Sequence, residues 1–391
     1  MNLAVSTIQN LRSNNRALLL EQLRQQATSR VDLAQKTGLA KSAVTTIVNE
    51  LIRDDIVREC SIASAPRAGR PAVLLDIAPQ KLFGIGLIIN RSNTLLCAVD
   101  LKCSVLQSQQ LPTRTFRTPS ECTDWIYHTV DTWFASPETP MENCIGFSVG
   151  AAGPVDRAKG IIRNPPDFKR FHNYPIVQIL RRRYSLPIVF ENVAVLFAQA
   201  EYLHGTMQNY HNTLFVFWVE NGIGSVILND GVVYRGFGSF AGEIGHTCVE
   251  PGGIQCACGS TGCLEAYLKK ETTEARFGPF DWHEVVDGAM LGQPRAIEIL
   301  DYYVRYLGIA LSNAINFMDP DSICLYLADH YKPACILERL SAYLNQHAVI
   351  CQSHRVDLIS ASIPYSAPAA ASVSPLLTMF FQSGGNLTNS I

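Results

Sequence analysis

The chain has 391 residues, too many for one ordinary core, so two or three domains are expected. With 47% hydrophobic and 17% charged residues, its composition is typical of a globular protein and excludes a largely disordered chain. No apolar run approaches the roughly 18 residues that a membrane helix needs, and the N-terminus lacks the regions of a signal peptide. We therefore expect a cytoplasmic protein without membrane insertion. Its 12 cysteines should be reduced, and any cluster of them should hold metal rather than form disulfides.

Charge is unevenly distributed along the chain. Residues 1–71 carry ten Lys/Arg and six Asp/Glu, a net charge of +4, whereas the remainder carries 22 basic and 28 acidic residues, a net charge of −6. A basic N-terminal segment on an acidic remainder is the asymmetry expected when only that segment binds a polyanion such as DNA.

The first 53 residues predict three helices. The first covers residues 14–24, where leucines gather on one face. Thr28 and Ser29 offer hydroxyl N-caps to a second, short helix that ends at Gly38. The third helix covers about 41–53, and its apolar residues recur at i, i+3, i+4 and i+7. Two helices joined by a tight glycine-containing turn are typical of a helix-turn-helix.

The polar face of the third helix is rich in groups that can donate or accept hydrogen bonds. Such groups suit base edges and phosphates, although a small helical bundle with a solvated face is the alternative. The residues that we expect to contact DNA from this helix are Lys41, Ser42, Thr45, Thr46 and Asn49.

A wing is predicted directly after the third helix. Strand-like runs at 56–60 and 72–76 flank a loop rich in proline, glycine and arginine. Arg67 and Arg70 of this loop lie on a slim backbone that can enter a minor groove, where the potential is most negative. The alternative is a basic interdomain linker. Together these elements predict a winged helix-turn-helix domain over residues 1–75.

A metal site is predicted where one histidine and three cysteines follow each other at the spacing H-x9-C-x-C-x4-C. The glycines between them allow the backbone to turn tightly enough for the four side chains to converge. Four protein ligands of this kind form a closed tetrahedral zinc site, which has a structural role because no position is open for a catalytic water. The alternative is a chance cluster of small buried side chains. The predicted ligands are His246, Cys256, Cys258 and Cys263.

Around these ligands the sequence resembles a known family. The Glu-Ile-Gly-His stretch at 243–246 and the Cys-x-Cys-Gly-x-x-Gly-Cys-Leu-Glu stretch at 256–265 resemble the signature of the ROK family (repressor, open reading frame, kinase). The segments at 150–162, 191–194 and 221–231 are also similar to segments of this family. The resemblance covers about 76–391. Because a helix-turn-helix domain precedes this part, the whole chain resembles the family's regulators of sugar uptake rather than its free-standing kinases.

The resemblance implies an α/β fold over 76–391, the actin-like (ribonuclease-H-like) ROK body, with two lobes and a sugar cleft between them. Strand-like and helical stretches alternate along this part of the sequence, which agrees with an α/β fold. Strands are predicted at 83–89, 94–101, 144–149, 187–190 and 213–219. Helices are predicted at 124–134, 193–202, 295–317 and, in the tail, 367–371 and 376–381.

The sequence departs from the family's kinases at three places, so we expect no enzyme activity. The stretch 84–91 lacks the Asp, the glycine pair and the Thr of the first phosphate loop. Val193 stands where the resemblance implies the catalytic Asp. Glu220 and Asn221 replace the Gly-Thr of the second phosphate loop, and Glu220 adds negative charge where a triphosphate would bind.

The resemblance also implies sugar-binding positions, although the Asp of the set is missing. The alternative for the two glutamates is helix capping or solvation. The implied residues are Asn192, Glu243, His246 and Glu265.

Three functions remain open after the sequence alone. The first is a homodimeric or homotetrameric regulator that binds a double-stranded DNA operator and responds to a sugar or sugar phosphate. The second is a regulator controlled by a protein partner such as a sugar transporter component. The third is a ROK sugar kinase with a regulatory head.

Overall fold

The computed structural model describes residues 8–62, 73–163, 169–219, 222–327, 331–349, 353–363 and 368–387. The chain divides into two compact units, which are described separately below. Unit 1 consists of Met1–Leu196 and Ala369–Ile391, and unit 2 of Phe197–Pro368. The predicted domain boundary after residue 75 falls inside unit 1, on a strand that continues to Ile77, and it stays a prediction.

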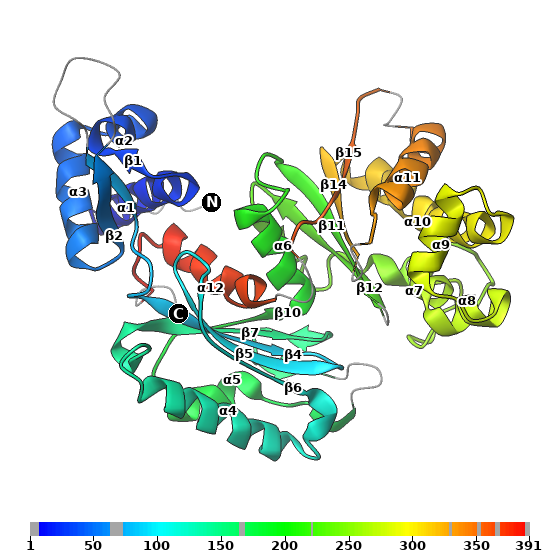
Figure 1. The fold of residues 1–391 in the computed structure, drawn as a ribbon, viewed down its shortest axis with the longest axis horizontal. Coiled ribbons are helices and arrows are strands. Elements are labelled where there is room, and N and C mark those ends of the chain that lie inside the picture. Colours follow the sequence, from blue (N-terminus) through cyan, green and yellow to red (C-terminus); the bar gives the residue numbers. More distant parts are fainter. Residues whose placement is uncertain are drawn as a thin grey trace. The chain divides into compact units, whose positions relative to one another are not determined.

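The N-terminal part of unit 1, called the head below, has the element order of a winged helix: helix, short strand, two helices and a two-stranded hairpin (Figure 1). The three strands pair antiparallel in the order β1-β3-β2. Leucines from the helices and from β3 form its buried core. The elements are α1 (Ile8–Gln25), β1 (Thr28–Ser29), α2 (Arg30–Thr37), α3 (Lys41–Arg53), β2 (Val57–Ile62) and β3 (Val73–Ile77).

Local sequence determines the helix boundaries in the head. The Ser29 hydroxyl accepts a hydrogen bond from the Asp32 backbone N–H and caps α2. Gly38 ends α2 with a left-handed conformation (φ 71°), which glycine adopts without steric cost. The Ser29 cap confirms the predicted start of the second helix, and Gly38 confirms the predicted turn between α2 and α3.

The rest of unit 1 is built on a five-stranded mixed sheet in the order β10-β7-β4-β5-β6. Strands β10, β7 and β4 are parallel, and β4, β5 and β6 are antiparallel. Helices α4 and α5 cover one face of the sheet, and α12 covers the other (Figure 1). The bounds are β4 (Phe83–Ile89), β5 (Asn93–Asp100), β6 (Val105–Pro112), α4 (Pro119–Phe134), β7 (Cys144–Ala151), β8 (Val155–Asp156), β9 (Ile161–Ile162), α5 (Ile176–Arg183), β10 (Ile188–Asn192) and α12 (Ala369–Gln382).

The two helical stretches predicted in the tail belong to one continuous helix, α12, which also includes the residues between them. Pro375 lies inside α12 and is buried with its neighbours against the sheet. The approach is close because β4 presents glycines: a Cβ on Gly86 would lie only 1.9 Å from the Ser372 Oγ. This packing offsets the backbone hydrogen bond that proline removes from a helix.

Unit 2 contains a second mixed sheet, in the order β13-β12-β11-β14-β15. Strand β11 pairs antiparallel with β12 and parallel with β14. A large apolar core joins this sheet to α10 and α11. The bounds are α6 (Val193–His204, which continues from unit 1), β11 (Asn212–Val219), β12 (Gly222–Asn229), β13 (Val232–Tyr234), α7 (Leu264–Leu268), α8 (Lys270–Phe277), α9 (Trp282–Met290), α10 (Pro294–Met318), β14 (Ser322–Leu327), α11 (Ala334–His347) and β15 (Asp357–Ser360).

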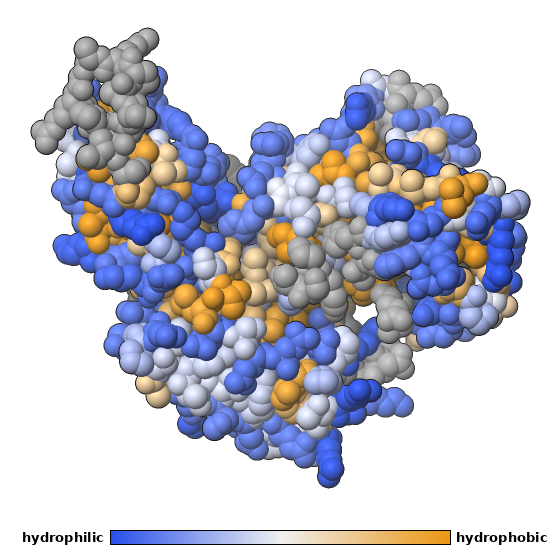
Figure 2. Space-filling view, viewed as in Figure 1, coloured by the Kyte–Doolittle hydropathy of each residue, from blue (hydrophilic) through white to orange (hydrophobic). Residues whose placement is uncertain are grey.

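On the face shown in Figure 2, hydrophilic residues predominate and apolar residues form separate patches. Among the helices of the described ranges, none combines the length and apolar character needed to cross a membrane.

Candidate metal centre and DNA-binding face

The four predicted metal ligands come together in unit 2. One ligand atom from each of His246, Cys256, Cys258 and Cys263 lies within 4.8 Å of those of the other three. The Cys256 Sγ is 3.8 Å from the His246 Nδ1, and the Cys258 Sγ is 3.7 Å from the Cys263 Sγ. Three thiols and one imidazole at this separation are a donor set that fits a tetrahedral zinc ion.

The loop that carries the cysteines is folded by its own backbone hydrogen bonds. The Cys256 N–H donates to the Ser260 carbonyl (2.8 Å), and the Gly262 N–H donates to the Ile254 carbonyl (2.8 Å). Gly262 has a φ of 76°, and a Cβ there would lie 2.0 Å from the Glu250 carbonyl oxygen, so only glycine fits. The loop can therefore bring its cysteines together only in this tightly folded conformation, which requires glycine at position 262.

Two stacked tyrosines fix the cysteine loop to the core. The rings of Tyr267 and Tyr306, from α7 and α10, are 4.2 Å apart at their centroids. The Tyr267 hydroxyl accepts from the Ile254 N–H (3.0 Å), and the Tyr306 hydroxyl donates to Glu250 (2.8 Å). Burial raises the pKa of Tyr306 to about 12, so this hydroxyl remains a donor at neutral pH. Sequence reasoning missed this support because its partners are far apart in the chain.

The electrostatics of Cys258 favour metal binding. The pKa of its thiol is lowered, chiefly because a backbone N–H of Ser260 stabilises the thiolate. The thiolate is the form that binds a metal. Burial raises the pKa of the neighbouring Cys263 thiol to about 12, so the case for a metal site rests on the convergence of the four ligand atoms.

The polar face of α3 is open to solvent. Lys41, Ser42, Thr45, Thr46 and Asn49 are all exposed, whereas the apolar stripe of the same helix is buried. The Thr45 and Thr46 hydroxyls donate to the carbonyls of Lys41 (2.9 Å) and Ser42 (3.1 Å). Their oxygens and methyl groups therefore remain available to a ligand. The predicted wing arginines, Arg67 and Arg70, lie outside the described residues.

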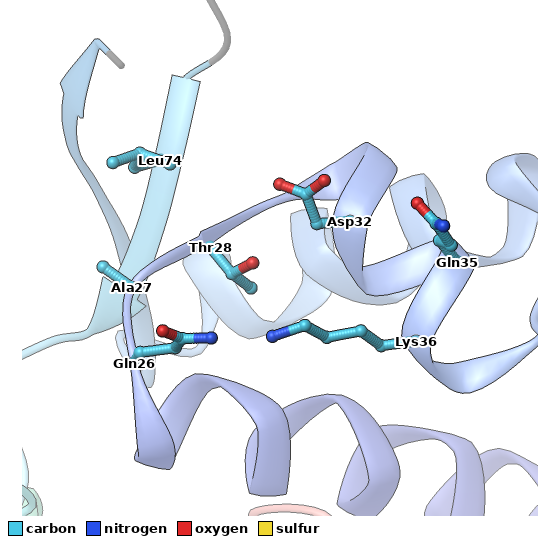
Figure 3. A pocket seen from close by; sticks show the side chains of 7 residues that line it. All are labelled: Gln26, Ala27, Thr28, Asp32, Gln35, Lys36 and Leu74. Carbon is cyan, nitrogen blue, oxygen red and sulfur yellow. The ribbon is translucent and has the colours of Figure 1, made fainter. Parts of the chain in front are cut away.

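A polar hollow lies on another side of the head (Figure 3). It is formed at the junction of α1, β1, α2 and β3, and no residue of α3 lines it. It is thus distinct from the candidate DNA-binding face. The lining residues are Gln26, Ala27, Thr28, Asp32, Gln35, Lys36 and Leu74.

The implied sugar-binding residues are divided between the units. Asn192 belongs to unit 1, where its Oδ1 accepts from the Ala194 N–H (3.0 Å). In unit 2, Glu265 lies 3.7 Å from the Lys269 Nζ. Glu243 is accessible to solvent, yet surrounding protein atoms desolvate its carboxyl group and raise its pKa; the charge of His246 opposes this shift and that of Glu265 adds to it. Its side chain makes no capping hydrogen bond.

Most of the stretch that replaces the first phosphate loop, residues 84–89, lies in the buried strand β4. Every residue of β4 is buried, and α12 packs directly on its glycines. Val193 is a buried residue at the start of α6. Glu220 and Asn221 lie outside the described residues. In the described residues, β4 therefore forms no glycine-rich phosphate loop, and residue 193 offers no carboxylate that could act as a base.

The fold and the cysteine loop define a two-lobed body of the ROK type with a winged-helix head. The model of the ROK family matches residues 85–370, and the chain belongs to this family. It is similar to the xylose repressor of Bacillus spizizenii, with 24% identity over 374 residues that cover 94% of this chain and 95% of the repressor. The DNA-binding transcriptional dual regulator NagC of Escherichia coli is 28% identical over 313 residues, 76% of each chain.

A solved structure shows the same architecture over nearly the whole chain. The crystal structure of a ROK family transcriptional regulator, a homolog of E. coli Mlc, has a TM-score of 0.78 and 21% identity and covers 96% of this chain and 98% of that one. The predicted family and the predicted fold are therefore confirmed.

Proposed function

We propose that the chain is a DNA-binding transcriptional repressor of carbohydrate uptake or metabolism genes. The observation that supports this most is the exposed polar face of α3 on a winged-helix head, in a chain that aligns over 94% of its length with a xylose repressor. We propose a cytoplasmic homodimer or homotetramer that reads a palindromic operator, since a two-fold protein presents two recognition helices about one DNA turn apart.

The wing provides a test of this function. Arg70→Ala is expected to weaken operator binding and to reduce the slope of log affinity against log salt by about one, because one phosphate-proximal cation is lost. Gel shifts at several salt concentrations measure both quantities. Unchanged affinity at every concentration would show that the wing does not contact DNA.

We propose that the metal is a structural zinc ion held by His246, Cys256, Cys258 and Cys263. Zinc would link the cysteine loop to the segment that carries His246. The cysteine loop is followed directly by α7, which contains Glu265. If one nitrogen of His246 binds zinc, the other is available to a ligand, so the metal would also orient an effector-binding residue.

We propose that the effector is a sugar or sugar phosphate that is recognised by Asn192, Glu243, His246 and Glu265 and is not chemically converted. Calorimetry against hexoses, N-acetylhexosamines, pentoses and their phosphates tests this. Glu265→Gln should abolish the heat of binding, whereas Glu271→Gln, an exposed residue of α8, should not. If none of these sugars binds, the proposed effector class is wrong.

Val193 favours a second candidate, in which a protein such as a sugar transporter component controls the regulator. Loss of the Asp from the sugar-binding set weakens recognition of a free sugar. A pull-down of the transporter component with and without sugar separates the two candidates. A kinase function is the less favoured alternative, and a phosphorylation assay with ATP and the same sugar panel is expected to show no product.

A further inference from the structure

A further cysteine lies beside the proposed metal site. Cys248 is exposed and follows His246 closely in the chain, but it is outside the cluster of four convergent ligands. Its sulfur lies against the cysteine loop, because a Cβ added to Gly262 would be 3.1 Å from the Cys248 Sγ. The proposed zinc site does not use this thiol.

The backbone pairs Cys248 with Cys263, which is one of the metal ligands. The two cysteines form an antiparallel bridge. The hydrogen bonds that hold this bridge come from the neighbours of the two cysteines. They run from the Val249 N–H to the Gly262 carbonyl (2.8 Å) and from the Leu264 N–H to the Thr247 carbonyl (3.0 Å). Cys248 and Cys263 therefore occupy a non-hydrogen-bonded position, where the side chains of an antiparallel pair are closest.

This pairing meets the geometric requirement of a disulfide. At a non-hydrogen-bonded position the Cα atoms are about 4.5 Å apart, and disulfides join residues whose Cα atoms are about 4.4–6.8 Å apart. A bond between Cys248 and Cys263 thus needs no rearrangement of the backbone. Cys258, the other exposed cysteine of this region, lies in a turn and not in the bridge.

We propose that Cys248 is an oxidation site and that its disulfide with Cys263 releases the metal. A hydroperoxide reaches Cys248 first, since Cys248 is exposed and Cys263 is only 1% exposed. The Cys248 sulfur attacks the peroxide, the O–O bond breaks, and a sulfenic acid forms together with an alcohol or water. The Cys263 thiolate then attacks the sulfenic sulfur, an S–S bond forms, and the departing hydroxide takes a proton to become water. The two sulfurs lose two electrons, which the peroxide gains.

The disulfide would change the part of the body that is proposed to bind the effector. It removes the Cys263 thiolate, so only three ligands remain for the metal. Cys263 directly precedes α7, which carries Glu265, and loss of the metal would loosen the start of this helix. The inference rests on the proposed zinc site and adds a second input, a hydroperoxide, to the proposed regulator. A dithiol reverses the step by thiol–disulfide exchange.

The variant Cys248→Ser tests the oxidation site, and Cys60→Ser is the matched control because Cys60 is an exposed cysteine of the head. Each full-length protein is loaded with zinc, freed of reductant and treated with hydrogen peroxide, and a zinc-binding dye follows the release of metal. We expect release from the unmodified protein and from Cys60→Ser, and retention by Cys248→Ser over the same time. Dithiothreitol with added zinc should restore the metal content. Equal release from Cys248→Ser would overturn the proposal.

Peptide mapping by mass spectrometry identifies the bond itself. A protease that cuts before Ile254 separates Cys248 from the three metal-binding cysteines, and fragmentation of the linked peptides shows which of these is bonded. We expect a bond between Cys248 and Cys263, whereas a bond from Cys248 to Cys256 or Cys258, or no bond, would overturn the proposal. If the unmodified protein holds no zinc, the metal site fails. Mapping of the peroxide-treated protein then still decides whether Cys248 and Cys263 form the disulfide.

Discussion

Replacing Cys258 with serine is expected to release the metal and to destabilise unit 2. The four ligand atoms converge within 4.8 Å, and with only three left the affinity for zinc should fall by orders of magnitude. Without the metal, the cysteine loop would keep its backbone hydrogen bonds and its contacts with the Tyr267–Tyr306 pair. We expect a loss of at least about 3 kcal/mol of unfolding free energy, which for a unit of this size is on the order of 10 °C in melting temperature.

Metal content and melting temperature measured on the same preparations test this expectation. The unmodified protein should contain about one zinc per chain. Cys248→Ser is the matched control, because Cys248 is exposed and close in sequence but outside the cluster of four. A Cys258→Ser protein with full zinc content, or an unmodified protein that binds none, would contradict the assigned ligands.

Replacing both Thr46 and Asn49 with alanine is expected to remove specific DNA binding while the head stays folded. Both side chains are exposed on α3, and alanine favours the helix more than either residue does. Each lost contact to a base edge costs about 1–3 kcal/mol, so the two together should weaken operator affinity at least about 30-fold. Affinity for unrelated DNA, which depends on phosphate contacts, should change little.

Gln35→Ala provides the control for this pair. Gln35 is an exposed residue of the same head, but it lines the polar hollow and not the face of α3 (Figure 3). Gel shifts with specific and unrelated duplexes should show a loss only for the Thr46/Asn49 variant. A comparable loss in Gln35→Ala would place the DNA on a different side of the head.

The head could be predicted closely because short-range patterns determine it. The predicted bounds of the third helix, 41–53, are those of α3, whose buried stripe repeats at helical spacing. The cap at Ser29 and the left-handed glycine at Gly38 are also local signals. Helix α1 begins six residues earlier than the predicted start at Asn14, and the Arg12–Glu50 ion pair with α3 supports this added length. Periodicity within one segment cannot reveal such a tertiary contact.

In the body, the metal site could be predicted because its ligands are close together in the sequence. The metal ligands span 18 residues, so their spacing alone indicated that they could converge. The continuity of α12 and the contact between Arg16 and Gly384, 368 positions apart, depend on packing between distant segments. A pattern of apolar residues shows that a segment is buried but does not identify what covers it. Helices α9 and α11, which the sequence did not single out, lie against α10 and form part of the same core.

The most direct test of the account is selection of duplexes from random-sequence DNA by the purified full-length protein. We predict enrichment of one palindromic motif with half-sites about one helical turn apart, and loss of that enrichment in the Thr46/Asn49 double variant. A sugar or sugar phosphate that binds the body should change the affinity for the enriched duplex. Recovery of no common motif from protein that is folded and loaded with zinc would contradict the assignment of this chain as a DNA-binding regulator.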